Sequence, residues 1–177
     1  MARGVGDQEK RLEVDLRRDS GEVVVFRLGQ GYYGLPSHTV RSVNPPRPIH
    51  SIPRRSSRLL RGLVAREGQL QLCISLHVLL AEKPEETTER RLIFVGGSGE
   101  CGWAFEVDAM DEIIRTGGPQ VNQELDLEHP LISHHLSLTE RSVSVFDAER
   151  LLATFSRLTA ATDSQDESSQ DEHWSIE

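Results

Sequence analysis

Apolar and polar residues alternate most clearly between residues 60 and 80, in LRGLVAREGQLQLCISLHVLL. Two apolar positions lead into a turn at Gly68, and the next apolar positions recur every second residue, which is typical of a half-buried strand. Leucines at helical spacing follow. The apolar positions are Leu63, Val64, Leu70, Leu72, Ile74, Leu76, Leu79 and Leu80. The pattern predicts a hairpin that runs into a short helix.

Similar patterns precede this stretch. The β-branched run EVVVFRL at 22–28 predicts a strand, and GQGYYGLP turns it into a second strand that ends at Pro36. Ser37–Val43 predicts a helical turn capped by Ser37, with Val40 and Val43 on one side. Four prolines between residues 45 and 53 then predict an irregular arm.

The pattern starts again after a charged, proline-containing linker at 81–89. Strands are expected at 91–95 and 103–107, an apolar stretch at 108–114, a polar crossing segment at 117–128, a hairpin at 131–146, and an amphipathic helix at 147–158. A shift of about 70 residues places Tyr33 on Trp103, Val40 on Met110 and Val43 on Ile113. Each half has too few large apolar residues to close a core alone, so two small barrels packed against each other are expected.

The 177 residues are enough for one substantial domain or for two small ones that share a core. No apolar run approaches the roughly 18 residues of a membrane span, and the first residues contain no apolar segment typical of a secretory signal. We therefore expect a cytoplasmic protein without direct membrane insertion, with Cys73 and Cys101 as reduced thiols.

Charge is distributed unevenly along the chain. The net charge is −8, and the segment from Asp163 to Glu177 holds six acids and no Lys or Arg. By contrast, Arg41 to Arg61 holds six arginines and no acid. We hypothesise that the acidic tail and this basic arm attract each other at low salt. Nucleic-acid binding is disfavoured, because the arm has no aromatic residue on which a base could stack.

The sequence offers no convincing catalytic, metal or cofactor site. Residues 29–34 match a dinucleotide-binding glycine pattern, but strand and turn residues follow where a helix is required. His134 and His135 lie in an expected strand and would point to opposite faces, so they cannot chelate one ion together. Carboxylates at Asp147 and Glu149 fit the start of a helix better than acid–base catalysis.

With this organisation, the sequence resembles the CheW-like domain of bacterial chemotaxis coupling proteins over roughly residues 23–158. The resemblance rests on four motifs: VVVFRLGQGYYGLPSHTVRSV, RLLRGLVAREGQLQLCISLHVLL, RLIFVGGSGECGWAFEVDAMDEII and SVSVFDAERLL. It implies an all-β fold with short helices, built as two interleaved five-stranded SH3-like barrels. Expected boundaries are a flexible N-terminus at 1–20 whose Leu12–Leu16 stretch could add an edge strand, one domain at 21–160 with repeats near 23–80 and 91–158, and a disordered acidic tail at 161–177.

The family's role is non-catalytic. The resemblance implies a scaffold that joins the cytoplasmic tips of methyl-accepting chemoreceptors to the regulatory domain of a CheA-type histidine kinase. Other CheW-like domains are a further candidate partner. In the family a receptor hairpin lies in an apolar groove between the barrels. The residues expected there are Val40, Val43 and Leu63 in the groove, with Arg41, Ala65 and Glu67 at its rim. Ordinary core packing is an equally good interpretation of Val40 and Val43.

Several residues depart from the family's pattern. Ala65-Arg66-Glu67-Gly68 stands where Asn-Leu-Arg-Gly is usual, and Leu72 and Ser75 replace a Pro and an Asp. The charge reversal at Glu67 indicates a specialised paralogue with its own partner preference. Trp174 in the acidic tail weakly resembles an aromatic recruitment motif of some receptor C-termini. The alternative function is a stand-alone β-barrel regulator that binds a small molecule or nucleic acid.

Overall fold

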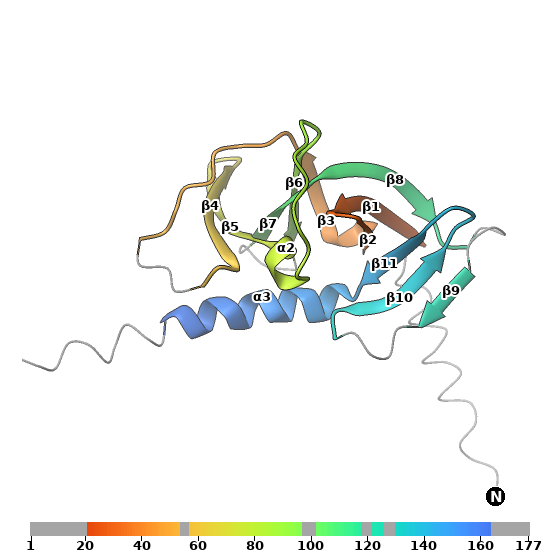
Figure 1. The fold of residues 1–177 in the computed structure, drawn as a ribbon. Coiled ribbons are helices and arrows are strands. Elements are labelled where there is room, and N and C mark those ends of the chain that lie inside the picture. Colours follow the sequence, from red (N-terminus) through yellow and green to blue (C-terminus); the bar gives the residue numbers. More distant parts are fainter. Residues whose placement is uncertain (1–20, 54–56, 97–101, 118–121, 126–129, 164–177) are drawn as a thin grey trace, which may run out of the picture.

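The computed structural model describes residues 21–53, 57–96, 102–117, 122–125 and 130–163, and of 122–125 and 159–163 it describes the backbone alone. Eleven strands and two α-helices make up this part of the chain (Figure 1). In chain order they are β1 Glu22–Leu28, β2 Gly31–Pro36, β3 Val40–Asn44, β4 Leu60–Arg66, β5 Gln69–Ile74, α2 Leu76–Leu79, β6 Arg91–Gly96, β7 Gly102–Val107, β8 Ala109–Arg115, β9 Asn122–Leu125, β10 Ile132–Ser137, β11 Ser142–Phe146 and α3 Ala148–Asp163.

The strands form two sheets that share both halves of the sequence. The first sheet has the order β8-β1-β2-β11-β10-β9, and the second has the order β3-β6-β7-β5-β4. Strands of the first sequence half therefore lie beside strands of the second in each sheet, as expected for interleaved barrels. The ranges 23–80 and 91–158 thus describe sequence repeats rather than separate sheets.

The two sheets have matching connectivity. Exchanging β1 for β6, β2 for β7, β3 for β8, β4 for β10 and β5 for β11 converts one strand order into the other. Each sheet contains one parallel pair, β11 with β2 and β5 with β7, while the other pairs are antiparallel. Among the strands in the described residues, β9 has no counterpart in this exchange, so the first sheet has six strands there rather than the expected five.

Continuous apolar runs explain why β1 and β6 lie inside their sheets. Such a run fits a strand that is buried on both faces. On β1, Val23 and Val25 face a small cluster within the first sheet, while Phe26 and Leu28 join a larger central cluster. On β6, Leu92 and Phe94 face the second sheet's own cluster, while Ile93 and Val95 join the central one.

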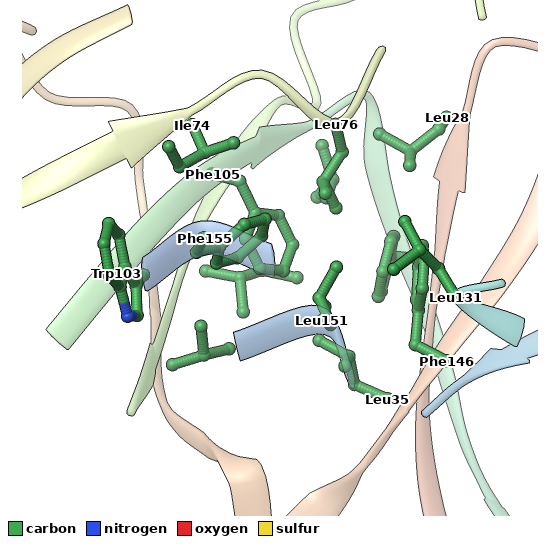
Figure 2. Packing of buried hydrophobic residues seen from close by; sticks show 14 of the residues in the cluster. Leu28, Leu35, Ile74, Leu76, Trp103, Phe105, Leu131, Phe146, Leu151 and Phe155 are labelled. Atoms are coloured by element: carbon green, nitrogen blue, oxygen red, sulfur yellow. The ribbon is translucent and has the colours of Figure 1, made fainter. Parts of the chain in front are cut away.

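The central cluster lies between the sheets and is covered by α3 (Figures 1 and 2). Its aromatic residues pack face to face or tilted: Phe26 and Phe146 have ring centroids 6.4 Å apart, and Trp103 and Phe155 5.6 Å apart. Both sheets and α3 contribute to this cluster. Neither barrel could keep its apolar residues from water without the other.

Helix α3 begins and continues largely as its sequence predicts. The Asp147 side chain accepts a hydrogen bond from the backbone N–H of Arg150 at 3.0 Å, which satisfies a donor in the first helical turn. Leu151 and Phe155 are buried on one face. The helix extends five residues beyond the expected end at residue 158, to Asp163.

The stretch Ser37–Val43, predicted as a helical turn, is mostly a strand. Only Ser37–Thr39 forms a 3-10 turn, with Pro36 rather than Ser37 at its N-cap, and residues 40–44 form β3. The equivalent stretch 109–115 forms β8. The pairing register shifts at both strands, opposite β6 and β1, and such a bulge disturbs the strict alternation that would have indicated a strand.

The remaining predictions concern the arm, the linker, the crossing segment and the two ends of the chain. The arm after β3 and the linker after α2 contain no helix and no named strand in their described residues, as predicted. The crossing segment predicted at 117–128 contains the short strand β9, which pairs with β10 alone. The expected disordered tail at 161–177 begins too early, because residues 161–163 continue α3; the rest of the tail and the expected edge strand at Leu12–Leu16 lie outside the described residues.

Candidate protein-binding site

The first group of candidate residues lies on β3. Val40 is half-buried and packs against the central cluster, whereas Val43 is 37% exposed. Arg41 is exposed and lies over Gly96, where a Cβ atom would collide with the guanidinium group. Asn44 ends the strand, immediately before Pro45. Val40 therefore contributes to the core, and Val43 remains available on the surface.

A hollow of about 410 Å³ lies where β3 meets the first turn of α3. Its lining includes Arg41, Gly96, Glu149 and Leu152. Because β3 belongs to the second sheet and α3 follows β11 of the first, this hollow marks the seam between the two units. It combines an apolar floor with one cation and one carboxylate, the composition of a surface that can hold part of another protein.

The second group lies on the β4–β5 hairpin. A two-residue turn, Glu67–Gly68, joins the strands, and both residues have positive φ, 50° and 79°. This is the backbone of a tight hairpin turn with the right twist for the flanking strands. Ala65 and Glu67 are exposed beside Leu70, whose side chain is 63% exposed. The hairpin tip thus presents the apolar side chain of Leu70 next to the negative charge of Glu67.

The proline-rich arm supports this hairpin along the outer edge of β4. His50 and Leu63 exchange two backbone hydrogen bonds of 2.8 Å, and Arg47 donates to the carbonyl of Ala65 at 3.2 Å. Gly62 has φ 151°, and a Cβ atom there would collide with the carbonyl of His50. A glycine is needed at this position because the arm approaches the strand so closely.

The six candidate residues fall into two groups in the second sheet. Val40, Arg41 and Val43 lie on β3 at one edge of the second sheet, and Leu63 and Ala65 lie on β4 at the other edge, with β6, β7 and β5 between them. Two separate surfaces result: the seam at β3 and the hairpin tip. Trp174 lies outside the described residues.

Sequence reasoning missed a buried polar cluster at Asp108, between β7 and β8. Asp108 is fully buried and accepts hydrogen bonds from the backbone N–H of Gly29 at 2.7 Å and from Nε2 of His77 at 2.9 Å. Burial alone would raise its pKa, but the bonds from His77 and from the amides of Gly29 and Glu85 lower the pKa of Asp108 overall. The sequence gives little signal for this cluster, because Asp108 is one of four acids between residues 106 and 112.

This cluster ties the linker and α2 to the first hairpin. The hydroxyl of Tyr33 donates to Glu82 at 2.8 Å, and burial together with that carboxylate raises the pKa of Tyr33. Burial also raises the pKa of the Cys73 thiol to about 12, so this cysteine is not a reactive thiolate. The hydrogen bonds of Asp108 and Tyr33 hold the linker and α2 against the first hairpin.

Comparison with known proteins agrees with this architecture. Residues 22–156 match the CheW-like domain. The chain belongs to the CheW-like domain family. Among solved structures, the CheW-like chain is similar to the crystal structure of the scaffolding protein TtCheW from Thermoanaerobacter tengcongensis, with a TM-score of 0.63 and 20% identity over 72% of this chain and 88% of that one. No curated protein matches the chain.

Two further observations concern the described part of this CheW-like chain. None of its helices combines the length and the apolar character needed to cross a membrane. Within the same residues, no three His, Cys, Asp or Glu side chains gather in a way that could hold a metal ion. His134 and His135 instead lie next to serine hydroxyls, with Nδ1 of each 2.8 Å from Ser133 and 3.1 Å from Ser144 respectively.

Proposed function

We propose that this chain is a non-catalytic coupling protein that joins the cytoplasmic tips of methyl-accepting chemoreceptors to the regulatory domain of a CheA-type histidine kinase. The match of residues 22–156 to the CheW-like domain carries this proposal. Two sheets packed around one core, with exposed residues at the seam and at the hairpin tip, support it. The protein would work in the cytoplasm, held at receptor arrays by its partners.

In this proposal, the seam at β3 contacts the receptor and the hairpin tip selects the partner. Val43 supplies exposed apolar area two residues along β3 from Arg41, which lines the hollow together with Glu149. Leu63, Ala65 and Glu67 form the second contact surface. A helical hairpin laid on such surfaces buries a modest area, so affinity on the order of micromolar is expected, and multivalency in an array would strengthen it.

The first prediction concerns Val43. Val43→Ser should lower capture of a purified receptor tip about fivefold, because it removes apolar contact area from the seam without opening the core. The matched control is Ile113→Ser: Ile113 is 63% exposed on β8, the counterpart of β3 in the other sheet. Equal capture by wild type and both variants would remove the seam from the proposal.

Charge at the hairpin tip gives a separate experiment. Glu67→Arg should change which receptor tips and kinase regulatory domains co-purify with the chain, while Glu67→Gln should act in the same direction but more weakly. Unchanged partner choice in both variants would contradict specialisation at this turn. Failure to bind any receptor tip or kinase domain, combined with binding to a polyanion that declines steeply with salt, would favour the alternative barrel regulator.

A further inference from the structure

A second hollow of about 340 Å³ lies between the start of β4, the helix α2 and the linker that follows it. Three arginines line it: Arg58, Arg61 and Arg90. Three acids also line it, and each already has a partner. Glu106 pairs with Arg61, Asp108 with His77, and Glu82 accepts a hydrogen bond from Tyr33.

Arg58 and Arg90 are less closely paired with these acids than Arg61 is. Arg58 is exposed and has no hydrogen-bond or ion-pair partner in the part of the chain that the structure describes. Nη2 of Arg90 donates to the neutral carbonyl of Glu85 at 2.8 Å, while its buried Nε has no hydrogen-bond partner and lies 3.9 Å from Oδ1 of Asp108. The hollow can therefore accept further carboxylates.

An apolar rim adjoins these cations. Val78, on α2, is 47% exposed and lines the hollow together with Pro84. A ligand that fits this surface carries carboxylates and one large apolar group close together. The last fourteen residues of the chain, SQDESSQDEHWSIE, have this chemistry, because Asp171 and Glu172 stand two or three positions before Trp174.

The end of α3 places that segment within reach. Phe155 packs on Trp103, and the cluster they share includes Leu60 and is joined by Ile52, which flank Arg58 in the sequence. From Phe155 the helix continues to Asp163, a rise of about 12 Å, and in Figure 1 it runs past α2 towards the side of the molecule where β4 lies. Fourteen residues can then span up to roughly 46 Å.

We propose that the acidic segment 164–177 binds this hollow within the same molecule. Its carboxylates at Asp171 and Glu172 pair with Arg58 and Arg90, and Trp174 packs against Val78. A tethered segment has an effective concentration in the millimolar range, so it occupies the hollow ahead of a free acidic partner of similar affinity. The inference goes beyond the proposed coupling role and does not depend on it.

Quenching of tryptophan fluorescence tests the proposal on the full-length chain. Trp103 is only 7% exposed, so a neutral quencher such as acrylamide reports mainly on Trp174. Raising NaCl from 20 mM to 500 mM should increase the quenching constant about twofold, because salt screens the ion pairs and releases the segment. Arg58→Glu should produce the same increase at low salt.

A charge exchange separates a specific contact from general attraction. Adding Asp171→Arg to Arg58→Glu should restore protection of Trp174, because Glu172 can still pair with Arg90, while Arg115→Glu should leave quenching unchanged, since Arg115 is exposed on the other sheet. Circular dichroism confirms that each variant is folded. Quenching that ignores both salt and Arg58 would overturn the proposal, as would protection that grows with protein concentration, which would mean that a second copy is bound.

Discussion

Glu67 occupies a backbone conformation that most L-amino acids avoid. Its φ of 50° lies in the left-handed region, where a side chain with a Cβ atom is strained, and Gly68 beside it has φ 79°. Tight hairpin turns of this kind favour Asn-Gly. The chain therefore keeps a glutamate at a position where it costs stability, which fits a role for its charge in partner choice.

The residue-scale prediction follows from this strain. Glu67→Asn should raise the free energy of unfolding by about 0.5–1 kcal/mol, because Asn tolerates the left-handed region better. Urea denaturation measures the change. Glu67→Gln serves as the control, since it removes the charge but keeps the backbone strain and should change stability by less than about 0.3 kcal/mol. An equal rise in the free energy of unfolding in both variants would show that loss of the charge, and not relief of backbone strain, stabilises the protein.

Ser75 is a second single residue with a clear local role. Its hydroxyl accepts a hydrogen bond from the backbone N–H of Val78 at 3.4 Å, so it caps α2. Serine and aspartate are both good N-cap residues. The replacement of the family's usual Asp at this position therefore preserves the start of the helix.

At the scale of elements, Asp108 connects segments that the sequence keeps far apart. Its carboxylate joins the β1–β2 turn through Gly29, α2 through His77, and the linker through the amide of Glu85. A buried carboxylate is tolerated only where hydrogen bonds replace water, and these donors supply them. The linker between the two sequence repeats is thereby held against the first hairpin.

Asp108→Asn should lower the free energy of unfolding at pH 7 by about 2–4 kcal/mol. The substitution removes the charged partner of His77, and the side-chain NH2 that it introduces faces the N–H donors of His77 and Gly29. The folded pKa of Asp108 is lowered, so the carboxylate's contribution is present above its unfolded pKa of about 3.9 and is lost as pH falls through the folded value. The difference between wild type and variant should therefore shrink below about pH 4.

Urea denaturation at pH 7, 5 and 3.5 measures this pH dependence. The control is Glu86→Gln, which changes an exposed linker carboxylate and should leave stability nearly unchanged at every pH. A difference between wild type and Asp108→Asn that stays constant down to pH 3.5 would show that the charge of Asp108 does not provide its stabilisation.

At the scale of the whole molecule, exchange of strands makes the two barrels one folding unit. Each sheet contains strands of both sequence halves, and the central cluster takes residues from both sheets and from α3. Neither half can fold its own sheet without the other half present. A single cooperative transition is expected for the domain.

Phe155→Ala should lower the free energy of unfolding by about 3–5 kcal/mol, since Phe155 is fully buried against Trp103. Far-ultraviolet circular dichroism and tryptophan fluorescence should still report one shared midpoint, because loss of the central cluster weakens both sheets together. Leu158→Ala, on the same helix but only half-buried, is the control and should cost clearly less. Two separate midpoints would mean that the barrels unfold independently.

Local patterns in the sequence determined most of the elements. Alternation and β-branched runs located the hairpins at residues 22–36 and 60–74, and the spacing of Leu151 and Phe155 located α3, because these signals depend only on residues close in the chain. The internal shift of about 70 residues and the family motifs predicted two interleaved barrels. Bulges in β3 and β8 hid those strands, since they disturb the alternation.

Only the tertiary structure decided where distant residues meet. The order of strands in each sheet places Val43 and Leu63 at opposite edges, and no local pattern records which strands become neighbours. The hydrogen bonds of Asp108 and the arginines around the second hollow also depend on contacts between segments tens of residues apart. Local propensity acts through neighbouring residues, whereas sites of this kind arise from packing, which brings remote residues together.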